Sequence, residues 1–154
     1  MIEIRNTLAT DTEALKTVLN SIDLFPAEML DDMISDYLGN PESEDIWLTA
    51  VENDQPMGLA YCVPEKLTNG TFNLLAIGVR SDLQGKGIGR KFMAHLEALL
   101  TQKGKRIIIV DTSGSDDFAL TRKFYEQLGY AKEATIRDFW DDGEDKVTYY
   151  KRLQ

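Results

Sequence analysis

The chain has 154 residues, the size of one ordinary domain, and 43% of them are hydrophobic, which is enough for one core and too many for a disordered protein. Seventeen Lys and Arg against 26 Asp and Glu give a net charge of −9, which argues against a nucleic-acid partner and fits partners that are small or cationic. One cysteine and one histidine exclude an intrachain disulfide, a Cys-based zinc cage and a multi-His metal site.

The first half of the chain predicts a strand, two helices and a three-stranded meander. Alternating apolar and charged residues favour a strand, whereas apolar residues three and four positions apart favour helices. Gly39 ends the second helix, and Thr68-Asn69-Gly70 is a strong turn signal. In chain order, the predicted elements are strand 2–5, helix 11–22, helix 26–38, and strands 46–51, 57–63 and 71–79.

The second half predicts two helices and three strands. Its elements are a helix from the glycine run 85–89 to Lys103, strand 106–110, a helix from Asp116 or Asp117 to Leu128, and strands 130–136 and 146–150. No linker, repeat or low-complexity tract divides the chain, so we treat residues 1–154 as a single domain. The order β-α-α-β-β-β-α-β-α-β-β indicates an α+β fold with one central sheet.

The glycine-rich loop after strand 71–79 is the most informative stretch. Gly85, Gly87 and Gly89 stand at alternate positions and leave no Cβ between the backbone and a ligand. The first amides of the following helix have no partner within that helix, so they can bind an anion. Lys86 and Arg90 add positive charge to an otherwise acidic chain. The loop therefore predicts a pyrophosphate cradle.

Two other glycine-rich phosphate-binding motifs match this sequence less well. A P-loop needs Lys-Ser or Lys-Thr after a glycine, and a dinucleotide fingerprint needs G-x-G-x-x-G in the first βα unit. This loop reads G-x-G-x-G in mid-chain. A tight turn without a ligand remains the alternative on these residues alone.

Two motifs in the chain resemble those of the GCN5-related N-acetyltransferases. Gln84-Gly85-Lys86-Gly87-Ile88-Gly89 is similar to that family's Q/R-x-x-G-x-G/A signature, and the strand before it ends in Ile77-Gly78-Val79. The later segment Phe124-Tyr125-Glu126-Gln127-Leu128-Gly129-Tyr130 is similar to the family's Y-E-K-L-G-F helix. The resemblance implies a mixed, mostly antiparallel sheet flanked by helices, and acetyl-CoA as co-substrate.

The resemblance also implies where acetyl-CoA binds. Its diphosphate would lie on the loop, its pantetheine arm would pair with the edge of Ile77 and Val79, and Arg122 could reach a phosphate, although an exposed helical cation is more often solvated. The implied loop residues are Gln84, Gly85, Lys86, Gly87, Ile88, Gly89 and Arg90.

For catalysis, the resemblance places Tyr125 opposite the CoA sulfur, where a phenol can protonate the departing thiolate. Tyr125 could instead simply pack in the core. The base is less defined, because the position at which some family members carry a glutamate is Asn73. Asp111, at the end of strand 106–110, is the best remaining carboxylate, and a turn or cap aspartate is the alternative. The family's Asn and Ala before the tyrosine are Phe118 and Thr121 here.

Fold analogy suggests Phe25, Tyr61, Asn73 and Trp140 as walls of the acceptor site. We expect direct acetyl transfer to the primary amine of a small molecule, with a protein amine or a non-catalytic acyl-CoA sensor as alternatives. His95 and Cys62 are interpreted as packed residues, and the acidic turn 141–145 as a solvated hairpin without a metal. Without an apolar run near 18 residues or a signal-peptide layout, we expect a cytoplasmic protein with no membrane partner, compatible with a homodimer.

Overall fold

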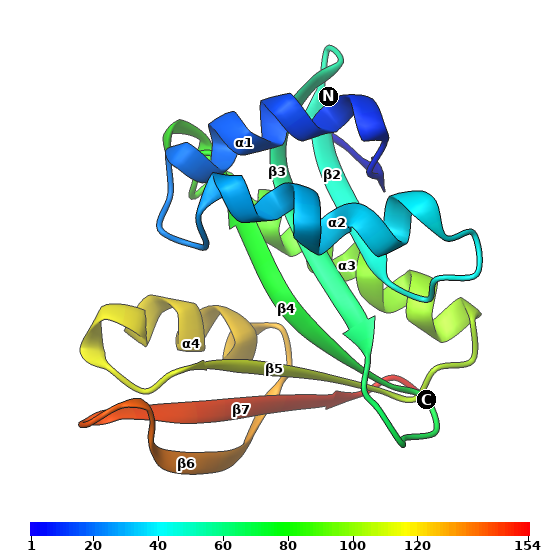
Figure 1. Ribbon diagram of the computed structural model, residues 1–154. Helices are drawn as coiled ribbons and strands as arrows, with labels where there is room; N and C mark the ends of the chain where they lie inside the picture. Colours follow the sequence, from blue (N-terminus) through cyan, green and yellow to red (C-terminus); the bar gives the residue numbers. More distant parts are fainter.

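A computed structural model describes residues 1–154 and contains one seven-stranded sheet in the order β1-β2-β3-β4-β5-β7-β6 (Figure 1). Only the pair β4 and β5 is parallel, and the other five pairs are antiparallel. The strands are β1 (Glu3–Asn6), β2 (Ile46–Glu52), β3 (Gln55–Pro64), β4 (Thr71–Val79), β5 (Ile107–Ser113), β6 (Ala131–Asp141) and β7 (Glu144–Arg152). The helices are α1 (Thr12–Asn20), α2 (Leu30–Gly39), α3 (Ile88–Gln102) and α4 (Ala119–Gln127). The predicted fold class and element order are confirmed. No helix is long and apolar enough to cross a membrane.

Helices cover the two faces of the sheet and bury two apolar clusters. On one face, α1 and α2 pack over Trp47, Leu59 and Ala76, as the apolar stripes of these helices predict. On the other face, α3 and α4 share a larger cluster that includes Phe92 and Tyr125. In Figure 1, α1 and α2 lie in front of β2, β3 and β4, and α4 lies beside β5. Successive residues of a strand therefore point to different helix layers.

The sheet opens between its two parallel strands. β4 and β5 pair from Thr71 opposite Ile107 to Leu74 opposite Val110, and both strands continue beyond that point without pairing to each other. The register of β3 against β4 shifts here, so that Leu75 is an extra residue of β4. A bulge bends its strand and increases the local twist. One edge of β4 after Leu74 is therefore free, and Figure 1 shows the resulting divergence of β4 from β5.

Two strands, β5 and β6, extend three or more residues beyond their predicted ends. β5 continues to Ser113, because Asp111 to Ser113 pair with β7 even though they are not apolar. β6 continues to Asp141, although residues between Ile136 and Asp141 leave the register with β7. All eleven residues of β6 are exposed, so this edge strand has no buried face from which a pattern could have predicted its length.

Candidate active site

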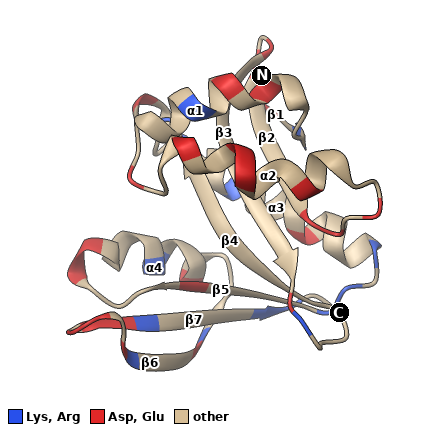
Figure 2. Cartoon of the chain, viewed as in Figure 1, with Lys and Arg blue, Asp and Glu red and all other residues tan.

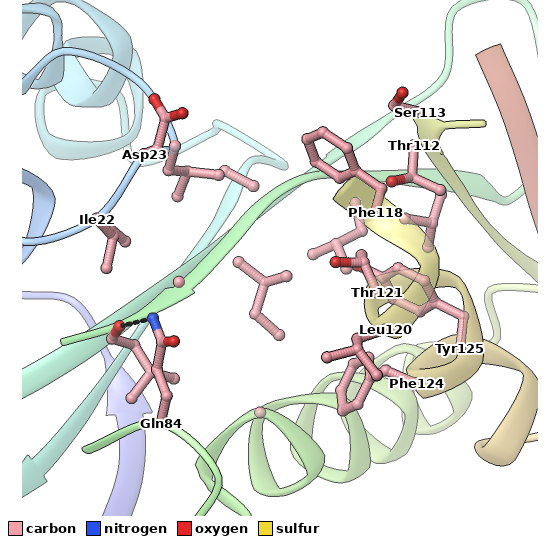
Figure 3. A pocket seen from close by; sticks show the side chains of 18 of the residues that line it. Ile22, Asp23, Gln84, Thr112, Ser113, Phe118, Leu120, Thr121, Phe124 and Tyr125 are labelled. Carbon is pink, nitrogen blue, oxygen red and sulfur yellow. Dashed lines mark hydrogen bonds between the residues drawn. The ribbon is translucent and has the colours of Figure 1, made fainter. Parts of the chain in front are cut away.

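A cavity of about 1010 Å³ occupies the opening between β4 and β5. Its walls come from β4, the glycine loop, β5, α4, the segment between α1 and α2, and the turn between β6 and β7. Figure 3 shows Phe118, Leu120, Thr121 and Phe124 on the α4 side and Gln84 on the opposite side. The cavity thus lies at a free strand edge, where an extended ligand can add main-chain hydrogen bonds.

The glycine loop forms one end of this cavity. Gly85 and Gly87 adopt φ values of +78° and +83°, a left-handed region that other residues enter only with strain. α3 begins directly after Gly87, and its first internal bond runs from the Lys91 amide to the Gly87 carbonyl. The amides before Lys91 have no partner within the helix and are therefore available to an anion. Arg90 lines the cavity here, whereas Lys86 is exposed outside it.

Gly89 allows α3 and α4 to meet closely. A Cβ on Gly89 would lie 3.3 Å from the Phe124 ring, tighter than most contacts of this kind. The ligand-facing backbone at the start of α3 is thereby held against α4. The spacing of the glycines has two physical causes: backbone conformation at 85 and 87, and close packing at 89.

The free edge of β4 carries the other predicted cofactor contacts. Ile77 and Val79 line the cavity, and the Gln84 side-chain amide donates to the Val79 carbonyl at 3.1 Å (dashed line in Figure 3). Gln84 thus holds the loop against the end of β4. A pantetheine amide approaching the Val79 carbonyl would meet a site that already accepts one such hydrogen bond.

Tyr125 lies on α4 at the inner wall of the cavity. It is 3% exposed and packs edge-to-face against Phe124 and Tyr130, with ring centroids at 5.2 and 5.9 Å. Its hydroxyl has no hydrogen-bond partner in the protein and is not among the fully enclosed polar atoms, so the cavity is its outlet. Burial raises the pKa of Tyr125 well above 10, so the hydroxyl keeps its proton at neutral pH.

Asp111 lines the cavity from the opposite face of the sheet. Its Oδ1 accepts a 2.6 Å hydrogen bond from Thr148, and its Oδ2 lies 3.9 Å from Lys146 Nζ. Thr148 alternates along β7 with the core residues Val147 and Tyr149, so Asp111 points away from the layer that holds Tyr125. The two predicted catalytic residues therefore approach the opening from its two sides.

The structure brings together only part of the predicted site. Besides the loop, β4 edge, Tyr125 and Asp111, the cavity includes Trp140. Arg122 instead donates to the carbonyls of Ser113 and Ser115, at 2.8 and 2.7 Å, and holds the turn before α4.

Three of the four predicted acceptor walls lie outside the cavity lining. Phe25 packs against the α1 and α2 cluster, and Tyr61 stacks on Trp47 at 4.1 Å. Asn73 is buried and donates to Glu65 at 3.2 Å, while its Oδ1 has no partner. These residues sit in strands or loops near the opening, but their side chains join other contacts. Fold analogy gave their positions in the chain and not their directions.

Glu144 and Ser113 are among the cavity residues that the sequence analysis did not name as site candidates. Glu144 was interpreted as part of a solvated hairpin, and Ser113 was not singled out. Ser113 Oγ donates to Glu144 Oε2 at 2.8 Å across the paired strands β5 and β7. Only the strand register brings these two side chains together, and no local sequence signal reports it.

A mixed sheet that opens between two parallel strands, with an anion-binding glycine loop at the opening, defines the acyl-CoA N-acyltransferase fold. Residues 4–130 match the Acetyltransferase (GNAT) family, and the chain belongs to it. A crystal structure assigned to this family, from Desulfovibrio desulfuricans, superimposes with a TM-score of 0.92 and 27% identity over 100% of both chains.

Other similar proteins carry named acceptors. A 5-NmdU N-acetyltransferase of Pseudomonas phage PaMx11 is 27% identical over 84 residues, which are 54% of this chain and 56% of that protein. The chain spans about half the length of the curated relatives it matches. The ribosomal-protein-S18-alanine N-acetyltransferase of Escherichia coli has a TM-score of 0.82 at 20% identity, over 100% of this chain and 95% of that one. An aminoglycoside 6'-N-acetyltransferase complexed with coenzyme A has a TM-score of 0.78 at 18% identity, over 99% and 97% of the two chains. These last two likenesses establish the fold alone.

Proposed function

We propose that the chain is an acetyl-CoA-dependent N-acetyltransferase that moves an acetyl group directly to the primary amine of a small molecule. The observation that carries the proposal is the cavity, which joins an anion-binding loop, a free strand edge and a buried tyrosine hydroxyl. The residues fit the co-substrate: the amides at the start of α3 would hold the diphosphate, and the β4 edge at Ile77 and Val79 would pair with the pantetheine arm.

Acetyl-CoA supplies an activated acyl group. When the acceptor amine attacks the thioester carbonyl, a C–N bond forms and the C–S bond breaks, leaving a thiolate that needs a proton. Tyr125 supports that step, because its hydroxyl is protonated and has no competing partner in the protein. Burial raises the pKa of the phenol, but a thiolate in the same poorly solvated place is made more basic by the same cause. The low solvation of this place therefore does not oppose the transfer of a proton from the Tyr125 hydroxyl to the thiolate sulfur.

The acceptor must lose a proton for the amine to attack. Asp111 is the carboxylate of the acceptor face that lies next to Val110 and the start of the opening, and it can take this proton directly or through a water. Both of its oxygens already face Thr148 or Lys146, so it is a hydrogen-bonded base and not an isolated one. No covalent enzyme intermediate is required, since holding both substrates in the opening supplies much of the advantage.

The proposal is tested by measuring thiol release from acetyl-CoA with polyamines, amino acids, aminoglycosides and peptides as acceptors. Turnover with a free amine would support it, and turnover with peptides alone would indicate a protein acceptor. Micromolar acetyl-CoA binding with no turnover would indicate the sensor alternative, and absence of binding would reject both. A cytoplasmic location, a homodimer, and the expected lack of metal, membrane and nucleic-acid partners stay predictions from the sequence.

A further inference from the structure

Glu144 is a cavity carboxylate without a cationic partner. It is the first residue of β7, and no Lys or Arg nitrogen lies within 4.0 Å of it. Its Oε2 accepts the hydrogen bond from Ser113, which is itself only 5% exposed and so provides a fixed anchor. Asp111, by contrast, already faces Lys146. Asp23 also lines the cavity without an ion pair, but it is exposed in the segment between α1 and α2. On the strands of this face, Glu144 is therefore the cavity carboxylate that is free to bind a cation.

Trp140 lies beside the same part of the cavity and is held there by the β6–β7 turn. The irregular segment of β6 includes Asp138 at φ +56°, whose amide donates to Asp145 Oδ1 and whose Oδ1 accepts from the Gly143 amide. Lys146 Nζ lies 4.1 Å from the Phe139 ring centroid, and the Trp140 ring meets Phe139 edge-on at 4.8 Å. Trp140 stays 48% exposed while lining the cavity. An aromatic face in this position attracts an ammonium group.

The surrounding charge favours a cation as well. Figure 2 shows the β6–β7 turn as a concentration of acidic residues next to the opening. Asp138, Asp141, Asp142 and Asp145 belong to it. The cation of β7 nearest to the turn, Lys146, is already placed between Asp111 and Phe139. A positively charged acceptor would be drawn toward this turn.

The distance between the proposed site of acetyl transfer and Glu144 decides which nitrogen of an acceptor Glu144 can bind. Tyr125 packs against Tyr149, which pairs with Val110 at the start of the opening. The Glu144 carboxylate is bound to Ser113, which lies three residues beyond Val110 on β5, about 10 Å at the usual rise of a strand. Glu144 is thus badly placed for the reacting amine and well placed for a second charge.

We propose that Glu144 and Trp140 bind a second ammonium group of the acceptor, so that the preferred acceptors are long diamines or polyamines. This inference rests on the proposed acetyltransferase function. One amine, neutral, reaches the thioester between Asp111 and Tyr125, while the distal ammonium lies against the Trp140 ring and the Glu144 carboxylate. An acceptor with only one nitrogen, or with two nitrogens close together, cannot occupy both places.

The test compares 1,3-diaminopropane, 1,5-diaminopentane, 1,8-diaminooctane and spermidine with n-alkylamines of equal length. For the wild-type enzyme, kcat/KM should rise with the spacing of the nitrogens, and the longest diamine should exceed octylamine by about 10–100-fold. In Glu144→Gln and Trp140→Leu, the ratio of diamine to monoamine should fall by at least about tenfold, mainly through KM. Glu133→Gln is the matched control, because it removes the same charge from an exposed position of β6 outside the acidic turn and outside the cavity lining. It should change the ratio less than twofold.

Calorimetry of 1,8-diaminooctane binding to each protein in the presence of coenzyme A gives a second readout that needs no turnover. Equal use of diamines and monoamines by the wild-type enzyme would overturn the inference and leave the proposed function intact. So would an unchanged ratio and Kd in Glu144→Gln, or an equal loss in Glu133→Gln. Lack of thiol release with every amine would reject the proposed function, and the inference would then fail with it unless calorimetry still showed diamine binding that depends on Glu144.

Discussion

Replacing Tyr125 by Phe separates its packing from its hydroxyl. The three aromatic contacts of the ring, with Phe124, Tyr130 and Tyr149, need no oxygen atom. The hydroxyl has no partner in the protein, so the substitution leaves no donor or acceptor unsatisfied. We therefore expect the free energy of unfolding to change by less than about 0.5 kcal/mol.

The effect on catalysis should be much larger. If Tyr125 protonates the departing thiolate, kcat should fall by about 10²–10⁴-fold, or roughly 3–5.5 kcal/mol of transition-state stabilisation. The Kd for acetyl-CoA should stay within about twofold, because the proton is needed only when charge develops on sulfur. Thiol release gives kcat, and calorimetry on the same preparation gives Kd. Since the pKa of Tyr125 lies above its ordinary value of 10.0, its proton should remain in place as pH rises from 7 to 9.

Tyr130→Phe is the matched control. Its hydroxyl donates to Glu97 at 2.8 Å, so this substitution should cost about 1 kcal/mol of stability and leave kcat within about twofold. The two variants should therefore show opposite patterns, one losing turnover and the other losing stability. Near-wild-type kcat in Tyr125→Phe would refute the acid role and leave Tyr125 as a packing residue.

Three further predictions address binding and stability. Gly87→Asp should weaken acetyl-CoA binding at least about 100-fold in calorimetry, because it places a carboxylate at the diphosphate site. Gly104→Asp is the control, since Gly104 also has a left-handed backbone but lies far from the loop, and it should leave binding unchanged. An equal loss of binding in both variants would contradict the proposed diphosphate site. Asp11→Asn should cost about 1–3 kcal/mol at pH 7, because Arg5 lowers the pKa of the buried Asp11 carboxyl. That difference in urea unfolding should persist above pH 3.8 and vanish as pH falls through the lower folded-state pKa; a gap that stays constant down to pH 2 would contradict it. Leu67→Asn should raise stability by about 0.5–1 kcal/mol, since Leu67 is fully exposed at φ +64°, and an unchanged Tm would count against this strain.

Much of the fold follows from local patterns. Apolar spacing and turn residues predicted the order of all strands and helices, because most elements press one face into a core. The end of β6 could not be found in this way, since both of its faces are exposed and residues between Ile136 and Asp141 follow the turn instead. The opening of the sheet has no local signal either, apart from the resemblance to a family that has one.

The site residues likewise divide into those that a local motif predicts and those that only the folded structure brings together. The glycine loop and Tyr125 could be located because each lies in a contiguous motif whose residues have a steric or chemical reason to be there. Glu144 could not, because its place in the cavity depends on the pairing of β7 with β5 and on the hydrogen bond from Ser113, 31 positions earlier. Tyr61 and Asn73 show the converse failure, in which the right strands were chosen and the side chains point to other partners.

One backbone feature organises the whole site. Where β4 and β5 part after Leu74 and Val110, each strand still alternates its side chains between two layers. On β5, Val110 joins the core beside Tyr125, and the next residue, Asp111, faces the opposite layer. In the proposed reaction, a ligand in the opening is therefore approached by a phenol from one side and by carboxylates from the other. The proposed acid and acceptor would lie on opposite sides of a thioester because the sheet is split there, so the free edge proposed for the co-substrate and the two-sided approach have the same structural origin.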